Sequence, residues 1–194
     1  MSLQEDQHYI ERTLAGDTHA FASLVDRYKH MVYTLALRMV KNREEAEEVA
    51  QDVFFKVYQG LDRFKGDAKF STWLYKIAYN RSLDYVKKQS RDLDTSPIDA
   101  FTERYVRSME NTLEGLEREE RSKTIKEAMQ ELSPDDSFLI TLHYYEELSL
   151  SEIAAIMDEN ANTVKVRLFR SRKRLAEILK NRLEPETIRS YGRK

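Results

Sequence analysis

Apolar side chains recur at helical spacing through the first part of the chain and predict amphipathic helices. From Thr18 onward the recurring positions are Phe21, Leu24, Val25, Tyr28, Val32, Leu35, Ala36 and Met39, which is the spacing of one helix face. Asp17 precedes this helix and is expected to cap its free amides. Asn42 is expected to cap the next helix by accepting a hydrogen bond from the Glu45 amide, in a capping-box geometry.

A third helix is expected after a loop at Gly66, with Ser71 as its cap. The segment 1–89 would then form one helical domain. In the segment 90–116 the helical periodicity fades, Pro97 interrupts helix continuity and acids accumulate. This pattern predicts an acidic linker, either a solvated tether or a segment that lies in a basic channel in place of nucleic acid.

Helical periodicity returns in the segment 117–184, which is expected to form a second domain. Ser133 and Pro134 predict the start of a helix there, as a cap and a first-turn proline. The final segment, 185–194, is expected to be a disordered tail.

A helix-turn-helix pattern lies within this second domain. Ser149 and Glu152 have the spacing of a capping box that opens a short helix, 150–157. A turn at 158–160 leads into a long basic helix from about Ala161. A short helix, a tight turn and a longer helix are typical of the helix-turn-helix motif.

The chain as a whole shows no sustained alternation of apolar and polar residues, and Gly (5) and Pro (3) are scarce. With 194 residues, 41% of them hydrophobic, it has enough apolar surface for one sizeable core or two small ones. The fold class predicted is all-α: two small helical domains joined by an acidic linker, the second a helix-turn-helix domain.

The formal net charge of -2 conceals a strong division along the chain. The segment 162–174 contains no acid and six cations: Lys165, Arg167, Arg170, Arg172, Lys173 and Arg174. A local basic face of this kind, rather than the net charge, would meet a polyanion. The absence of cysteine excludes disulfides and thiolate metal sites. Without a signal-like N-terminus or a bilayer-length apolar stretch, a cytoplasmic location is expected.

The stretch 64–89 combines aromatic rings with Lys and Arg side chains on one helix. At about 100° per residue, Trp73 and Asn80 share one side, and Tyr75 and Tyr79 share another. Rings beside cations suit unstacked bases and a phosphate backbone, so single-stranded DNA is one candidate ligand. The alternative, which composition alone favours, is a buried helix whose tyrosine hydroxyls reach water.

The basic helix has a packing face and a cationic face. In helix-turn-helix proteins the N-terminal part of the second helix enters the major groove. Candidate readers of bases or phosphates are therefore Asn162, Thr163, Lys165, Val166, Arg167 and Arg170. Candidate phosphate contacts are Arg172, Lys173 and Arg174, and a solvated basic face is the alternative.

Carboxylates cluster on the helix expected after Asn42. A helical di-metal site needs paired Glu-x-x-His motifs, and only Glu5 with His8 has this spacing, so we expect no metal and no cofactor. The acids instead suit a basic protein partner, unless they are merely a solvated face. No nucleophile accompanies them, so we expect no enzymatic activity.

Taken in order, three stretches resemble the extracytoplasmic-function (ECF) group of bacterial sigma factors, the two-domain members of the sigma-70 family. Residues 42–54 resemble the helix that binds core RNA polymerase, with its acid-Ala-Glu-acid run and Gln-acid-x-Phe. Residues 64–88 resemble the loop and helix that open and hold the minus-ten element. Residues 148–175 resemble the reader of the minus-thirty-five element. The resemblance covers nearly the whole chain.

The resemblance implies a dissociable subunit that binds bacterial core polymerase, directs it to promoters and helps to melt the minus-ten element. Its partners would be core polymerase, duplex promoter DNA, the melted non-template strand, and an anti-sigma protein or accessory recruiter. The polymerase contacts implied are Glu45, Glu48, Gln51, Asp52 and Phe55.

The resemblance also implies two sets of DNA contacts. Those for the minus-ten element are Lys65, Gly66, Asp67, Ala68, Lys69, Phe70, Ser71, Thr72, Trp73, Lys76, Asn80, Arg81, Asp84, Lys87 and Lys88. Those for the minus-thirty-five element are Asn160, Asn162, Thr163, Lys165, Val166, Arg167, Arg170, Arg172, Lys173 and Arg174.

The second domain departs from the family pattern at its turn, where Asp158, Glu159 and Asn162 replace a Gly, an apolar residue and a Gly. Asn162 would tolerate a left-handed backbone, whereas Glu159 places an acid near DNA phosphates. Reading of the minus-thirty-five element is therefore expected to be weak or to depend on another protein. The rival interpretation is a dimeric helix-turn-helix regulator that binds duplex DNA without core polymerase.

Overall fold

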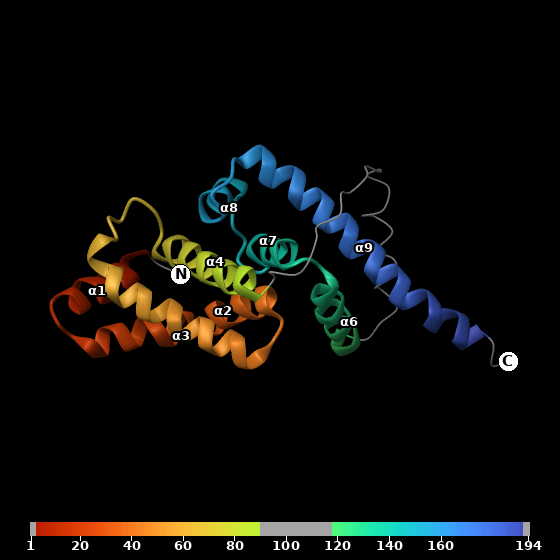
Figure 1. The fold of residues 1–194 in the computed structure, drawn as a ribbon, viewed down its shortest axis with the longest axis horizontal. Helices are drawn as coiled ribbons and strands as arrows, with labels where there is room; N and C mark the ends of the chain where they lie inside the picture. Colours follow the sequence, from red (N-terminus) through yellow and green to blue (C-terminus); the bar gives the residue numbers. More distant parts are fainter. Residues whose placement is uncertain (1–2, 90–117, 192–194) are drawn as a thin grey trace.

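The computed structural model describes residues 3–89 and 118–191 (Figure 1). The regular structure of these residues is entirely helical, which confirms the all-α prediction. The expected acidic linker at 90–116 lies outside the described residues.

The first group of helices is built around α2. Its elements are α1 (Leu3–Leu14), α2 (Thr18–Val40), α3 (Arg43–Gly60), the 3-10 turn η1 (Leu61–Arg63) and α4 (Phe70–Gln89). Helices α1, α3 and α4 all pack on α2. The apolar face predicted for α2 is the face that these neighbours bury, because its spacing matches one side of the helix.

Two predicted caps start these helices. The Asp17 carboxylate accepts hydrogen bonds from the amides of His19 and Ala20 at 3.0 and 3.2 Å. The Asn42 side chain accepts from the Glu45 amide at 3.2 Å. Both side chains satisfy amides that have no partner inside the helix.

The prediction that Ser71 caps the third helix was wrong. Helix α4 begins at Phe70, and the Lys69 carbonyl already accepts a hydrogen bond from the Trp73 amide at 3.2 Å. Phe70 is buried against Phe64 and Trp73. Packing of this ring therefore fixes where the helix starts.

The second group consists of α6 (Arg118–Glu131), α7 (Pro134–Tyr144), α8 (Leu150–Met157) and α9 (Ala161–Tyr191). Ser133 caps α7, and Ser149 caps α8 with the reciprocal capping box to Glu152. Helices α8 and α9 with the turn between them form the predicted helix-turn-helix.

Two backbone details of this group differ from the sequence-based expectation. Asp158, with φ of 60°, is the left-handed residue that ends α8, whereas Asn162 lies inside α9. Helix α9 also continues through Pro185 to Tyr191, into the segment expected to be a disordered tail.

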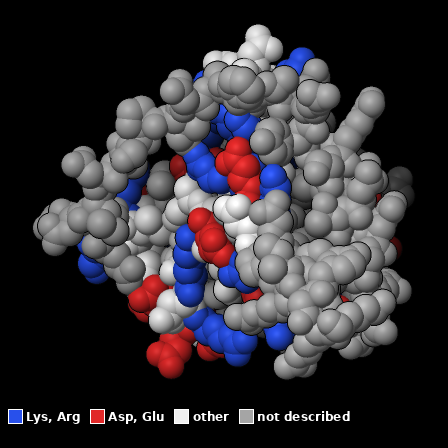
Figure 2. Space-filling view, turned by 90° about the vertical axis from the view of Figure 1, so that its right-hand side faces the viewer, with Lys and Arg blue, Asp and Glu red and all other residues white. Residues whose placement is uncertain are grey.

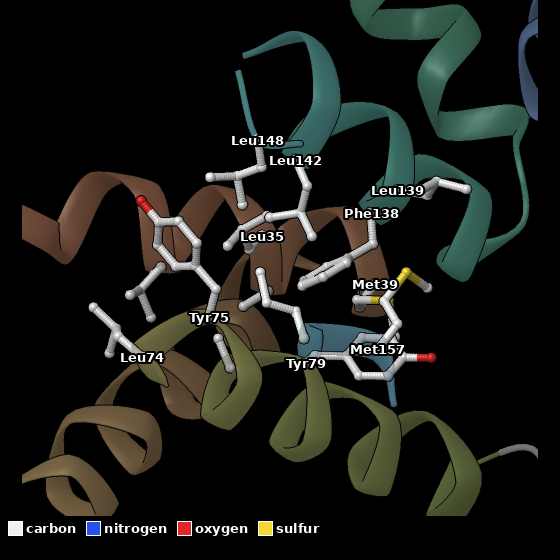
Figure 3. Packing of buried hydrophobic residues seen from close by; sticks show 14 of the residues in the cluster. Leu35, Met39, Leu74, Tyr75, Tyr79, Phe138, Leu139, Leu142, Leu148 and Met157 are labelled. Atoms are coloured by element: carbon white, nitrogen blue, oxygen red, sulfur yellow. The ribbon is translucent and has the colours of Figure 1, made fainter. Parts of the chain in front are cut away.

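The two groups of helices share one continuous apolar core. Helix α7 packs on α2, and α8 packs on α4. Figure 3 shows Tyr79 of α4 near Phe138 of α7, and Tyr75 of α4 near Leu35 of α2. Phe138 is 0% exposed, and its ring centroid lies 5.0 Å from that of Tyr79. Full burial of one such side chain contributes about 1.5–3 kcal/mol.

Candidate functional site

Helix α3 presents an acidic face opposite the face that it buries. Glu48, Gln51 and Asp52 are exposed, and Glu45 is half-buried. Phe55 is 59% exposed and lies one turn beyond Gln51 and Asp52. An exposed phenyl ring beside carboxylates suits a partner that is both basic and apolar.

Tyr58 extends this surface and was missed by the sequence reasoning. Its side chain is 48% exposed, and its ring packs edge-to-face on Phe21 with centroids 4.9 Å apart. Helical spacing could have identified Tyr58, because it lies three residues after Phe55 on the same helix.

The loop before α4 is exposed from Lys65 to Lys69, and its glycine, Gly66, has φ of 77°. In contrast, the predicted contacts Phe70 and Thr72 are buried. Phe70 forms a ring cluster with Phe64 and Trp73, with centroids 5.3 to 5.9 Å apart. Phe70 therefore supports the loop from beneath instead of standing free.

A cavity of about 460 Å³ lies between this loop and α1. Phe64, Gly66 and Phe70 line it on one side, and His8 and Glu11 of α1 line the other. Its mixture of rings and polar groups fits a flat ligand with a polar edge.

The α1 wall of the cavity is fixed to α2 by a buried polar cluster. Asp6 accepts from the Tyr28 hydroxyl at 2.6 Å and from Arg27 at 2.7 Å. Burial, together with the Asp6 contact, raises the pKa of Tyr28, so this hydroxyl stays a donor.

Two cations of the predicted minus-ten surface have acidic partners from the second group of helices. Lys69 pairs with Glu152 at 2.9 Å, and Lys76 pairs with Asp158 at 3.2 Å. The hydrogen bonds from Lys69 and then Ser149 lower the pKa of Glu152 to about 2. A third cation, Arg81, pairs with Asp52 of α3.

The remaining polar candidates of α4 face outward. Asn80, Asp84, Lys87 and Lys88 are exposed. Trp73 is half-buried in the ring cluster, and Ser71 lies in the first turn of the helix.

Tyr75 and Tyr79 do not lie at the protein surface, because the second group of helices covers them. They are 2% and 6% exposed. The Tyr75 hydroxyl donates to Glu146, and the Tyr79 hydroxyl donates to Asp135 at 3.3 Å. Burial and the nearby Asp135 raise the pKa of Tyr79 to about 12. The alternative of a buried helix therefore holds for the side of α4 with Tyr75 and Tyr79 and not for its exposed polar side, and these two hydroxyls reach carboxylates rather than water.

The start of α9 presents several of the predicted readers. Asn162, Thr163, Lys165, Val166 and Arg170 are exposed. Asn160 has a structural role as well, because its side chain accepts from the Thr163 amide at 2.8 Å. The exposed helix start fits the geometry by which this motif meets a DNA groove.

The expectation of one free cationic arc on α9 was wrong for two of its arginines. Arg167 pairs with Glu159 and lies 3.4 Å from Asp135, while Arg174 pairs with Asp136. These acids lie outside the segment 162–174, so its local composition did not reveal them.

The other cations of α9 also have neighbours. Arg172 lies over the Tyr144 ring at 5.9 Å, and Lys173 lies 3.8 Å from Glu177. At the end of the molecule seen in Figure 2, the described acidic and basic side chains likewise lie side by side. At this end of the molecule, the described side chains therefore mix the two signs of charge.

Two further observations concern chemistry and membranes. The residues that the structure describes contain no group of three or more His, Cys, Asp or Glu side chains placed to hold a metal ion. None of the described helices is long and apolar enough to cross a membrane.

The geometry so far defines a class: a helical protein of two groups of helices, with an exposed acidic and aromatic face on α3 and a helix-turn-helix. Family models narrow that class. Sigma-70 region 2 matches residues 24–92, and Sigma-70, region 4 matches residues 122–175.

Similar proteins extend over most of the chain. It is 35% identical to the RNA polymerase sigma-H factor of Pseudomonas aeruginosa, over 92% of this chain and 96% of the relative. It is 37% identical to the ECF RNA polymerase sigma-E factor of Escherichia coli, over 93% and 95% respectively. The chain belongs to the sigma-70 family, in its ECF group, and is an RNA polymerase sigma factor.

Solved structures share the fold. CnrH, in complex with the cytosolic domain of CnrY, matches with a TM-score of 0.63 at 21% identity, over 91% of this chain and 98% of that one. The sigma factor RpoE of Bartonella quintana, in complex with the anti-sigma factor NepR, matches with a TM-score of 0.62 at 23% identity, over 82% and 96%. The comparisons give the rival, a dimeric regulator, no support.

Proposed function

We propose that this sigma factor uses three separate surfaces: α3 for core polymerase, the loop and α4 for the minus-ten element, and the start of α9 for the minus-thirty-five element. The observation that carries the proposal is the exposed acidic and aromatic face of α3. A second observation supports it, because the exposed loop before α4 lines a cavity of its own. The protein acts in the cytoplasm and has no catalytic activity of its own, because the polymerase performs the chemistry.

The polymerase contact would be made by Glu45, Glu48, Gln51, Asp52 and Phe55. Carboxylates steer a basic partner and set its register, while the exposed phenyl ring supplies apolar contact area. We add Tyr58, because its exposed ring continues the same face.

The melted non-template strand would lie along the loop and the exposed polar side of α4. Extruding one base costs a few kcal/mol. Stacking on an aromatic side chain returns about 1–3 kcal/mol per base. The cavity beside Gly66 is large enough for one base, and the rings of Phe64 and Phe70 line it.

Reading of the minus-thirty-five element would rest on a smaller set than the sequence predicted. Lys165 and Arg170 are exposed and have no acidic partner among the described residues. Arg167 and Arg174 already form ion pairs with acids of the second group of helices. We propose that they position α9, and that the domain binds its DNA weakly or with help from another protein.

An anti-sigma protein is a further proposed partner. The support is by analogy: the relative RpoE was solved in complex with the anti-sigma factor NepR. The two halves of the present chain offer such a partner both an acidic and a basic surface.

Transcription in vitro tests the proposal directly. Purified bacterial core polymerase with this protein is expected to make start-site-specific RNA from a genomic promoter library, and core polymerase alone is not. RNA without defined start sites in both reactions would contradict the proposal.

A charge reversal tests the polymerase surface. Changing Glu48 and Asp52 to Lys is expected to abolish binding to core polymerase while helical content stays unchanged. Asp26→Lys with Glu120→Lys is the matched control, because it reverses the same number of exposed acids outside α3. Equal binding by the double variant and the control would place the docking surface elsewhere.

A further inference from the structure

The cavity beside the loop before α4 has a polar wall that comes from α1. Gln7, His8 and Glu11 line it on that side, and all three residues are exposed. The rings of Phe64 and Phe70 line the same space of about 460 Å³. Because the cavity has both rings and polar side chains, a flat ligand that stacks on a ring can turn its polar edge toward α1.

We propose that Gln7 and Glu11 contact the edge of the base that enters this cavity, and that they select a base with an exocyclic amino group over thymine. The inference rests on the proposed function, in which the loop before α4 captures one base of the melted strand. It adds a specificity role for α1. The Sigma-70 region 2 match begins at residue 24, so α1 lies outside it and the match does not supply this role.

A hydrogen bond joins the two side chains of the proposed pair. Gln7 Nε2 donates to Glu11 Oε1 at 2.9 Å. Residues four apart lie on the same face of a helix, so this bond holds the amide and the carboxylate side by side. Neither side chain has another hydrogen-bond partner among the residues that the structure describes. The pair therefore keeps a carboxylate oxygen that can accept and an amide N–H that can donate.

The position of this pair is fixed because α1 is anchored beside it. Ile10, the residue before Glu11, is 2% exposed in the apolar core. Asp6, the residue before Gln7, accepts from the Tyr28 hydroxyl at 2.6 Å and so ties α1 to α2. A polar group on a packed helix is held more precisely than one on a loop, which suits a contact that discriminates between bases.

The chemistry of the pair distinguishes thymine from the other bases. Cytosine, adenine and guanine each carry an amino group, and a carboxylate is a suitable acceptor for such a group. In cytosine and adenine a ring nitrogen beside the amino group can accept from the Gln7 amide. Thymine has a carbonyl oxygen in place of the amino group, so two acceptors would meet at Glu11. An unpaired contact of this kind selects against thymine.

Two single strands that differ in one base test the inference. Both are fluorescein-labelled oligothymidylates of about 12 nucleotides, and in one of them 5-methylcytosine replaces a central thymine. This base keeps the methyl group of thymine and exchanges a carbonyl and its neighbouring N–H for an amino group and a ring nitrogen. Since a homopolymer can shift its register, the replaced base can reach the cavity. Fluorescence anisotropy with the full chain bound to core polymerase gives the ratio of the two Kd values, and core polymerase alone gives the background.

We expect the strand with 5-methylcytosine to bind about five- to tenfold more tightly than the other. Glu11→Lys is expected to reverse this preference, because an ammonium group only donates and a thymine carbonyl accepts. Lysine also suits the last turn of α1, so the helix is kept. Glu11→Leu, which removes the polar group, is expected to bring the ratio close to one. The matched control, Glu120→Lys, reverses an exposed acid on α6 and is expected to keep the wild-type ratio. General attraction to phosphates cancels in the ratio.

The possible failures of the inference and of the proposed function are distinct. Equal binding of the two strands by the wild type, or an unchanged ratio in Glu11→Lys, would overturn the role of α1 and leave the capture of a base intact. A change of the ratio in Glu120→Lys as large as that in Glu11→Lys would also overturn it. If neither strand binds more tightly than to core polymerase alone, capture of a base by the loop fails, and the inference fails with it.

Discussion

The two basic surfaces of the molecule differ in where their acidic partners come from. On the minus-ten surface, Lys69 and Lys76 pair with acids of the other group of helices. On α9, Arg167 and Arg174 pair with acids of their own group. The cations of the first surface are therefore neutralised from the other group of helices, whereas those of the second are partly neutralised by their own group.

This difference separates two ways of limiting DNA binding. A contact between halves is lost when the halves separate, so it limits binding only in one arrangement. A contact within one half persists in every arrangement, because breaking it would expose the acids and disturb the helix-turn-helix. The three predictions below test this distinction, starting with the largest effect.

Phe138→Ala is expected to disturb both surfaces at once. The ring is fully buried and packs on Tyr79, so its removal leaves a cavity between α7 and α4. Such changes typically cost about 3–5 kcal/mol of stability. Urea unfolding followed by circular dichroism measures the loss.

Phe55→Ala is the control for that experiment. Its ring is 59% exposed, so we expect a change in stability within about 0.5 kcal/mol, together with weaker binding to core polymerase. A loss below about 1 kcal/mol for Phe138→Ala would mean that the two halves do not share the core described above.

Arg167→Ala and Arg170→Ala are expected to differ, although both remove one arginine of α9. Loss of Arg167 removes the cation that pairs with Glu159 and leaves Asp135 with the Tyr79 hydroxyl, which we expect to cost about 1–3 kcal/mol of folding stability. Arg170 is exposed, so its loss should leave stability within about 0.5 kcal/mol.

For DNA binding we expect the larger effect from Arg170→Ala. Arg170→Ala is expected to weaken binding to a minus-thirty-five duplex by about 1–3 kcal/mol for a base contact, or mainly to flatten its salt dependence for a phosphate contact. Unfolding curves and binding titrations at several salt concentrations give both quantities. If the two variants change the free energy of unfolding equally, Arg167 does not position α9 more than Arg170 does.

Local sequence was sufficient for the elements of the fold. The caps at Asp17, Ser133 and Ser149 act within three residues, so their hydrogen bonds follow from neighbouring sequence. The exposed acids of α3 were also predictable, because helix periodicity separates them from its buried face. The start of α4 was not, since it depends on the packing of Phe70 against Phe64.

The contact between the two halves could not be predicted in this way. Tyr75 and Glu146 are 71 positions apart, and nothing near either residue specifies the other. The same holds for Arg174 and Asp136, which are 38 positions apart. Helical spacing placed Tyr75 and Tyr79 on one side of their helix, but what covers that side depends on how α7 and α8 pack.

The smallest expected effect contrasts two acids that both reach the loop and α4. Burial raises the pKa of Glu146, although the hydrogen bond from Tyr75 opposes this. The contacts with Lys69 and Ser149 lower the pKa of Glu152. The two carboxylates should therefore contribute to stability with opposite dependence on pH.

A raised pKa in the folded state favours the neutral carboxyl, so the stability that it contributes is present at low pH and lost as pH rises through that pKa. Glu146→Gln, which keeps an oxygen to accept from Tyr75, should thus be more stable than the wild type at pH 7, and the gap should narrow as pH falls. For Glu152 the sign reverses: Glu152→Gln should be less stable at pH 7, with a gap that closes as pH falls from about 4.5 to about 2. Urea midpoints of both variants and the wild type, measured from pH 7 down to about pH 2, test this prediction. If both variants differ from the wild type in the same direction, burial and ion pairing do not distinguish the two acids.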